Sequence, residues 1–138
     1  MTNQTVDQIT DTIAALLRTL GQPERLKILL IIGQQEACVC HLEAALGMRQ
    51  AYISQHLMAL RQAGLVASRR DGRNIYYRLE DPSLLRFIRK AGEQAGLDQV
   101  RMSRALIPSM PSNCPCPHCA EEPVPQFEAR SFISITSL

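Results

Sequence analysis

The chain has 138 residues, of which 46% are hydrophobic and 20% are charged, and its net charge at pH 7 is +2. This composition excludes a wholly disordered chain, and the length allows one domain with a short appendage. No apolar run reaches the ~18 residues of a membrane-spanning helix, and no secretion signal is visible, so we expect a cytoplasmic protein. Thiols stay reduced there, so the five cysteines are expected to bind metals or react rather than to form a disulfide framework.

Two helices are expected in the first 33 residues. Apolar side chains at helical spacing predict an amphipathic helix over residues ~6 to 20, and Gly21 ends it. Pro23 and Glu24 are both favourable in a first helical turn, so a second helix starts there. Gly33 closes that second helix.

The next two helices form a helix-turn-helix. A short helix is expected from residue 38 or 40 to Leu46, and a longer one over residues ~49 to 63, before Gly64. Only the segment from Gly47 to Arg49 separates them, which is the tight, glycine-bearing connection of this motif.

A hairpin and a fifth helix follow. Two β-prone arms flank Asp71 and Gly72, which is a strong short-range hairpin signal. After Pro82 the fifth helix carries one apolar stripe, made of Leu84, Leu85, Ile88, Ala91 and Ala95. A hairpin placed directly after a helix-turn-helix predicts a mainly α winged helix of about five helices and a two-stranded wing.

Most of the eight prolines fall between residues 108 and 125, a segment that cannot be regular helix. We therefore expect a winged helix-turn-helix DNA-binding and dimerisation domain over residues 1–106. A Pro- and Cys-rich tail is expected over residues 107–138.

The charge is unevenly spread and indicates an anionic partner. Between residues 61 and 90, eight Lys and Arg side chains stand against three Asp and Glu side chains. Such a basic segment in a nearly neutral chain suits double-stranded DNA. A solvated helix face followed by a charged turn is the alternative explanation.

The fourth helix has a core face and an outer face. Ile53, Leu57 and Leu60 share the core face, and the N-terminal part of a recognition helix enters the major groove. Gln55 suits adenine, an alanine or tyrosine suits a thymine methyl, and the wing arginines suit backbone phosphates or the minor groove. Two helix residues, Ser54 and His56, are expected either at phosphates or in packing. The expected DNA-contacting residues are Gln50, Ala51, Tyr52, Ser54, Gln55 and His56 in the helix and Arg69, Arg70 and Arg73 in the wing.

The first and fifth helices carry apolar stripes that a small winged helix cannot bury by itself. Pairing the two helices across a two-fold axis buries both stripes and sets two recognition helices about one DNA turn apart. We therefore expect a homodimer on a near-palindromic operator. The expected dimer contacts are Ile13, Leu16, Leu17, Leu84 and Ile88.

The cysteines fall into two clusters. Cys38 and Cys40 open the third helix, and residues two apart in a regular helix point ~200° from each other. The pair can therefore hold one ion only if the helix start is extended, and two small core residues are the alternative. The second cluster lies among prolines in the tail and comprises Cys114, Cys116, His118 and Cys119.

Thiolate-rich sites select soft ions, namely As(III) or Sb(III) in trigonal sulfur and Cd(II), Pb(II) or Zn(II) with three or four sulfurs. A helix N-terminus favours the thiolate that such ions need. Two rival hypotheses keep DNA binding: a thiol redox switch, and a structural zinc tail that docks another protein. A thiol oxidase is rejected, because the "CPHC" motif lacks a βαβ scaffold, so the chain is not expected to be an enzyme.

Roughly residues 18 to 80 resemble the ArsR/SmtB family of metal-responsive repressors. The resemblance rests on "CVC" at the third helix, on "SQHLMALRQAGLV" in the fourth, and on "RRDGRNIYYRL" in the wing. It implies a homodimeric winged helix that represses transcription and leaves its operator when a soft metal or metalloid ion binds cysteine thiolates.

The chain departs from the family pattern at three points. Relatives with "CVC" complete the site with cysteines from an N-terminal arm of the other subunit, whereas here only the C-terminal tail offers them. His41 replaces the usual Asp, which makes His41 a candidate ligand. The fifth-helix pattern Asp-x-His is missing, because Asp81 is followed by Ser83, which argues against a nitrogen and oxygen site for zinc, nickel or cobalt.

Overall fold

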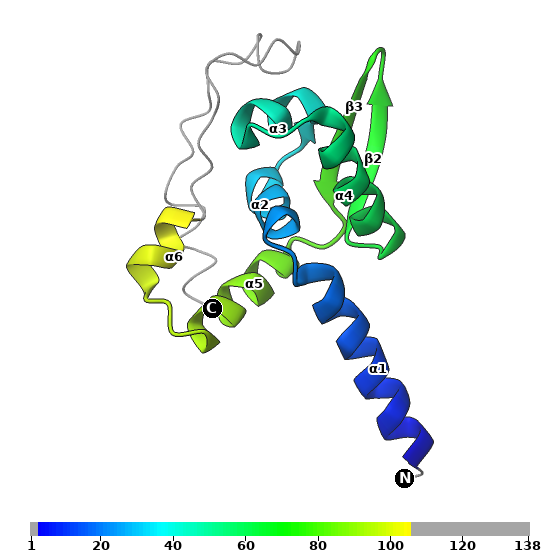
Figure 1. Ribbon diagram of the computed structural model, residues 1–138, viewed down its shortest axis with the longest axis vertical. Coiled ribbons are helices and arrows are strands. Elements are labelled where there is room, and N and C mark those ends of the chain that lie inside the picture. Colours follow the sequence, from blue (N-terminus) through cyan, green and yellow to red (C-terminus); the bar gives the residue numbers. More distant parts are fainter. Residues whose placement is uncertain (1–2, 106–138) are drawn as a thin grey trace.

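The computed structural model describes residues 3–105, which form a helical body with a small antiparallel sheet (Figure 1). The elements in chain order are α1 (Asn3–Leu20), α2 (Pro23–Ile32), β1 (Ala37–Cys38), α3 (Val39–Leu46), α4 (Gln50–Gln62), β2 (Val66–Asp71), β3 (Asn74–Leu79), α5 (Ser83–Gln94) and α6 (Gln99–Ala105). A search of the described residues finds no helix that is long and apolar enough to span a membrane.

Glycines end the helices where the sequence predicts. Gly33 follows α2 with φ of 56°, and Gly47 follows α3 in the left-handed conformation with φ of 65°. The Gly47 N–H donates to the Glu43 carbonyl and so satisfies one of the last carbonyls of α3. Because α4 starts at Gln50, the predicted three-residue connection of the helix-turn-helix is confirmed.

The wing is a β2–β3 hairpin whose turn is set by glycine. Asp71 pairs with Asn74, so the two loop residues are Gly72 and Arg73. Gly72 has φ of 61°, and no described residue other than glycine has positive φ, which is the pattern of a type II′ turn. The predicted mainly α winged helix-turn-helix is thus confirmed.

Two elements lie outside the prediction. β1 pairs with β3, so the sheet has three strands in the order β1-β3-β2 rather than two. α6 packs on α5, where Met102 is buried and a Cβ at Gly92 would clash with the Met102 Sδ atom. The missing side chain at Gly92 therefore leaves the space that Met102 of α6 fills.

The core joins α2, α3, α4, the hairpin and α5. Its fully buried members include Ile28 and Leu29 of α2, Leu42 of α3, and Leu57 and Leu60 of α4. These residues fix the rotation of α4 about its axis, because its apolar face must turn inward.

α1 projects away from this core (Figure 1). Val6, Ile9, Ile13 and Leu17 follow one another along α1, and each is at least half exposed. Leu16 instead packs against the protomer core, and Ile88 of α5 is buried in it. Of the expected dimer contacts, Ile88 is therefore already used within the protomer.

Candidate DNA-binding surface and cysteine site

The exposed face of α4 carries the predicted DNA readers. Gln50, Ala51, Tyr52 and Gln55 are exposed in the first two turns, and Ser54 is half-buried. These turns face outward because the opposite side of α4 is fully buried in the core. The four exposed side chains can form hydrogen bonds or apolar contacts with a partner without unfolding the helix.

His56 lies inside the protein rather than on this face. Its side chain is buried, and its Nδ1 atom accepts a hydrogen bond of 3.4 Å from Arg25 Nε in α2. Arg25 also donates to the Thr19 carbonyl at the end of α1, at 3.0 Å. Of the two roles expected for His56, this position favours packing over contact with phosphate, and it ties α4 to the α1–α2 junction.

The same histidine orients an exposed ring. Tyr52 meets His56 edge to face, with ring centroids 4.5 Å apart and an interplanar angle of 80°. Tyr52 is 45% exposed, so one side of its ring is supported while the other faces solvent. A tyrosine held in this way can offer its ring to a base without first losing rotamer freedom.

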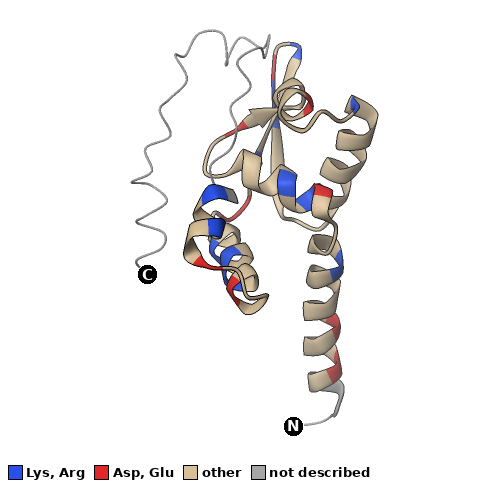
Figure 2. Ribbon diagram, turned by 60° about the vertical axis from the view of Figure 1, so that its left-hand side comes forward, with Lys and Arg blue, Asp and Glu red and all other residues tan. Residues whose placement is uncertain are grey.

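Two of the three wing arginines are placed as expected, and the third is engaged elsewhere. Arg70 and Arg73 are exposed in the hairpin, whose ribbon carries both basic and acidic positions (Figure 2). Arg69 instead forms an ion pair with Glu36 and donates hydrogen bonds to both of its carboxylate oxygens. The Arg69 Nη2 atom lies 2.6 Å from Glu36 Oε2.

The contacts of Arg69 hold the wing in place at the protein surface. The hydrogen bonds that Arg69 donates to Glu36 raise the pKa of Arg69 above its usual value. The guanidinium also lies over the Tyr76 ring, 4.7 Å from its centroid. Arg69 thus ties the wing to the segment before β1, and its role as a DNA contact stays a prediction.

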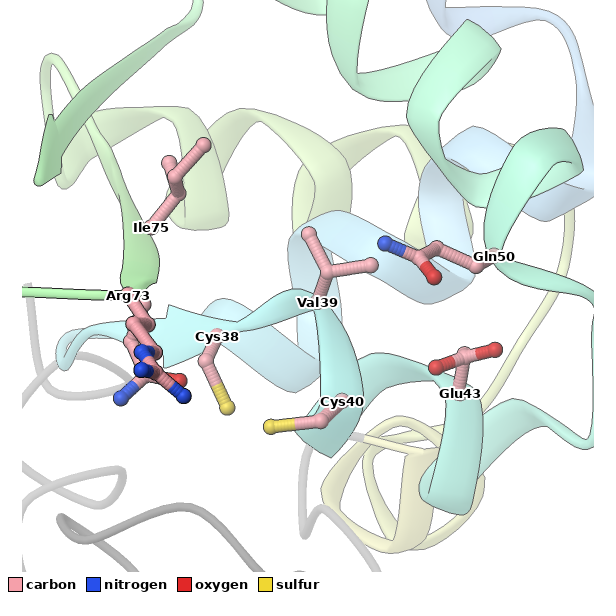
Figure 3. A pocket seen from close by; sticks show the side chains of 8 residues that line it. Cys38, Val39, Cys40, Glu43, Gln50, Arg73 and Ile75 are labelled. Atoms are coloured by element: carbon pink, nitrogen blue, oxygen red, sulfur yellow. The ribbon is translucent and has the colours of Figure 1, made fainter.

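Cys38 and Cys40 meet the geometric condition for a shared ion. Cys38 ends β1 and caps α3 with φ of −82° and ψ of 162°, which is extended backbone, and Cys40 lies in the first turn of α3. The helix therefore starts between the two cysteines, and their sulfur atoms turn toward each other (Figure 3). The extended start that the shared site requires is present.

Two features beside the Cys38 sulfur stabilise a thiolate, whereas the burial of this side chain disfavours one. The Cys38 side chain is buried against Tyr76, and its Sγ atom accepts the His41 backbone N–H at 3.3 Å. An N–H donor and the positive end of a helix both stabilise a thiolate. Cys40 is half-buried and lies nearer the surface.

The two cysteines open onto a cavity of about 200 Å³ that also touches the DNA-binding elements (Figure 3). Its lining residues are Cys38, Val39, Cys40, Glu43, Gln50, Arg73, Asn74 and Ile75. Gln50 is the first residue of α4, and Arg73 lies in the wing turn. The cavity therefore adjoins both candidate DNA-reading elements, which sequence reasoning missed because it depends on the pairing of β1 with β3.

The residues present fit part of a soft-ion site. The donors are two sulfurs, and within residues 3–105 no three His, Cys, Asp or Glu side chains are grouped to hold an ion. His41 is buried and is not among the residues that line the cavity. The tail candidates Cys114, Cys116, His118 and Cys119 lie outside the described residues. An ion bound at Cys38 and Cys40 would therefore need further ligands.

Comparison with known proteins gives consistent matches. Residues 22–68 match the family model described as bacterial regulatory protein, arsR family. The chain is 39% identical over 93 residues to the HTH-type transcriptional repressor SmtB of Mycobacterium tuberculosis, covering 67% of this chain and 69% of that protein. It is 42% identical over 65 residues to the arsenical resistance operon repressor of Escherichia coli, covering 46% and 56%.

A solved structure resembles the described fold. The homodimeric winged helix-turn-helix DNA-binding domain of Mb0332 from Mycobacterium bovis matches with a TM-score of 0.60 and 29% identity. The match covers 70% of this chain and 88% of that domain. That relative has the fold described above and is homodimeric.

Proposed function

The chain belongs to the ArsR/SmtB family of bacterial transcriptional regulators, and from this premise we propose that it is a DNA-binding repressor released by a soft metal or metalloid ion. The family is one of regulators and not of enzymes. The ion binds Cys38 and Cys40, and binding lowers the affinity of the protein for its operator. The observation that carries this proposal is the pair of sulfurs turned toward each other in a cavity shared with α4 and the wing.

DNA binding rests on α4 and the wing. Gln50, Ala51, Tyr52 and Gln55 reach base edges in the major groove, and Arg70 and Arg73 hold the backbone. All six are exposed in the protomer. The bases set the choice of sequence, whereas the arginines supply affinity that falls as salt rises.

A homodimer supplies the second half of the interface. The stripe along α1 is an apolar helix face that the rest of residues 3–105 leaves at least half exposed, and the relative from Mycobacterium bovis is homodimeric. Ile13 and Leu17 are its best-placed members, and the half-buried Leu84 of α5 extends it. Two-fold pairing places two copies of α4 on successive turns of a near-palindromic operator.

The chemistry of the donors sets the class of inducer. Thiolates prefer As(III), Cd(II), Pb(II) and Zn(II) over hard ions such as magnesium. The arsenical resistance operon repressor among the relatives agrees with this class. Because Cys38 and Cys40 provide only two ligands, we propose that Cys114, Cys116 and Cys119 of the tail, residues 107–138, complete the site, with His41 and His118 as weaker candidates.

The test is a titration of the full-length protein bound to DNA from upstream of its own gene. Under strict reduction and without oxidant, Cd(II) or As(III) should release the wild-type protein. Cys38→Ser and Cys40→Ser should still fold and bind DNA, because serine is nearly isosteric with cysteine, but should not be released. Release by oxidant alone would establish the redox switch instead, and bound zinc without any release would establish a structural tail.

Deleting the chain after Pro111 tests the shared site. The shortened protein should bind DNA and ignore the ion, as the serine variants do. If it binds the ion and leaves DNA as the full-length protein does, Cys38 and Cys40 sense without the tail.

A further inference from the structure

We propose that Glu36, an acidic residue, strengthens DNA binding because it holds the wing, through Arg69, in the orientation in which the wing meets DNA. Glu36 and Arg69 are then positioning residues, and neither has to contact DNA. This inference rests on the DNA binding of the proposed function and deepens it, because it assigns the orientation of the wing to one ion pair. It depends neither on the inducing ion nor on the cysteines.

The outer half of the wing has little packing of its own. Along β2 the burial falls from Val66, which is buried in the core, to residues 69–71, which are exposed. The tip of the hairpin also extends past α3 and α4 (Figure 1). A two-stranded hairpin is only marginally stable by itself, so its outer half needs a further contact to keep one orientation.

Glu36 and Arg69 connect the two edges of the sheet. The strand order is β1-β3-β2, and Tyr76 of the central strand lies opposite Cys38 of β1 and opposite Arg69 of β2. Residues directly opposite each other share one face of the sheet. Arg69 places its guanidinium over the Tyr76 ring on this face and binds Glu36, which directly precedes β1. The contact thus spans two strand spacings, about 10 Å.

The geometry of this contact fixes direction as well as distance. Arg69 donates from Nε to both Glu36 carboxylate oxygens, at 2.8 and 2.9 Å, and from Nη2 to Oε2 at 2.6 Å. A carboxylate that accepts from two nitrogens of one guanidinium is held in a defined orientation. Most surface ion pairs contribute little, and pairs with this two-nitrogen geometry are the exception. The pair therefore holds the outer wing at a fixed tilt relative to β1.

This role predicts an effect of opposite sign to that of simple electrostatics. A carboxylate near the interface repels phosphates, so its removal alone should strengthen DNA binding. Removal of the Glu36 carboxylate should instead weaken binding, because the wing that carries Arg70 and Arg73 must then be ordered during binding, which costs affinity. The same phosphates are neutralised in the final complex, so the salt slope should not change.

Asp71 provides the matched control. Its exposed carboxylate lies 3.9 Å from Arg69 Nη1, so it is a second acidic neighbour of the same arginine. Asp71 and Arg69 belong to the same strand, and a contact within β2 cannot fix the wing against the rest of the protein. Glu36→Gln and Asp71→Asn thus each remove one carboxylate beside Arg69, and only the first releases the wing from the segment before β1.

The experiment measures affinity for DNA from upstream of the protein's own gene over a range of salt concentrations. It uses the reduced full-length protein without added metal. Glu36→Gln should bind DNA about two- to tenfold more weakly than the wild-type protein, with an unchanged salt slope. Asp71→Asn should bind at least as tightly as the wild-type protein. Wild-type or tighter binding by Glu36→Gln would overturn the inference, and so would equal weakening in both variants.

Arg69→Met separates positioning from contact with phosphate. If Arg69 acts through Glu36, this variant should bind DNA more weakly with an unchanged salt slope, and adding Glu36→Gln to it should weaken binding no further. A salt slope that falls by about one in Arg69→Met would show that Arg69 contacts a phosphate and would overturn its positioning role.

Amide hydrogen exchange of the DNA-free proteins separates this role from a general loss of structure. In Glu36→Gln, exchange should be faster in β2 and β3 and unchanged in α4, whose inner face is buried in the core. Unchanged exchange in the wing, or faster exchange in α4 as well, would overturn the inference and leave the proposed function standing. A wild-type protein that does not bind this DNA would overturn the proposed function and this inference together.

Discussion

At the scale of single residues, Gln55 and His56 are neighbours with different tasks. Gln55 is exposed on α4, and His56 is buried beneath it. The helical wheel places both near the DNA-binding face, and only the packing of α2 against α4 separates them. Burial therefore assigns different roles to Gln55 and His56, which the sequence pattern alone does not distinguish.

Gln55→Ala should weaken binding by about 1–3 kcal/mol at one base pair of each half-site, because alanine cannot form the bidentate hydrogen bonds with adenine. Affinity for random DNA should stay the same. Competition binding with operators altered at one position measures this, and equal losses on specific and random DNA would show that Gln55 does not read sequence.

His56→Ala should lower the free energy of unfolding by about 1–3 kcal/mol, since it empties a buried site and strands the Arg25 donor. The salt slope of DNA binding should not change. Denaturant unfolding measures the first effect and salt titration of DNA binding the second. If stability is unaltered and the salt slope of DNA binding falls by about one, His56 contacts a DNA phosphate instead.

At the scale of elements, Asp81 anchors the start of α5. Its Oδ1 atom accepts the Ser83 backbone N–H at 2.9 Å, and this hydrogen bond lowers the pKa of Asp81 below its usual value. A lowered pKa means that the ionised carboxylate stabilises the fold above the pKa of the unfolded chain, about 4. This stabilisation is lost as pH falls through the lower, folded-state value.

Asp81→Ala should therefore lower the midpoint of thermal unfolding at pH 7, and the difference from the wild-type protein should shrink toward pH 3. Glu80→Ala removes the adjacent carboxylate and serves as the control. A difference that is constant from pH 7 to pH 3 would show that the charge of Asp81 does not stabilise α5.

Most elements were predictable because their signals are local. Glycines at 33, 47 and 72 end helices or turn the hairpin, and Ile53, Leu57 and Leu60 share the core face of α4, as their spacing predicts. β1 has only two residues, too few for a strand to show its period of two. α6 packs on α5 through Met102 over Gly92, a fit between residues ten apart that has no periodic signature.

The candidate site was predictable in its residue types but not in its neighbours. The spacing of Cys38 and Cys40 implies that the two can share an ion only if the helix start is extended. The backbone at the N-terminus of α3 is extended, so this condition is met. Arg69 could not be assigned from sequence, because its partner Glu36 is 33 residues away. Arg73 and Gln50 reach the cysteines only through the sheet and the helix-turn-helix.

At the scale of the whole molecule, the apolar stripe of α1 should be the core of the homodimer. Ile13→Glu places a charge in that stripe and should give monomers by sedimentation, with a large loss of operator affinity because two half-sites are no longer bound together. Gln8→Glu, on the opposite side of α1, should remain dimeric. A dimeric Ile13→Glu protein would exclude α1 from the interface.

The whole molecule is proposed to work as one coupled system in which ion and DNA oppose each other. Linkage requires that an ion which lowers DNA affinity about 100-fold bind the DNA-free protein 100-fold more tightly, a coupling free energy of about 2.7 kcal/mol. This reciprocity separates an inducer from a structural ion, which binds both forms alike.

The most direct measurement is therefore the cadmium affinity of the reduced full-length protein, free and bound to DNA from upstream of its own gene. The free protein should bind cadmium more tightly than the DNA-bound protein, by the same factor by which cadmium weakens DNA binding. Cys38→Ser should abolish that difference. Equal cadmium affinity in the free and DNA-bound states of the wild-type protein would contradict a repressor released by ion binding at Cys38 and Cys40.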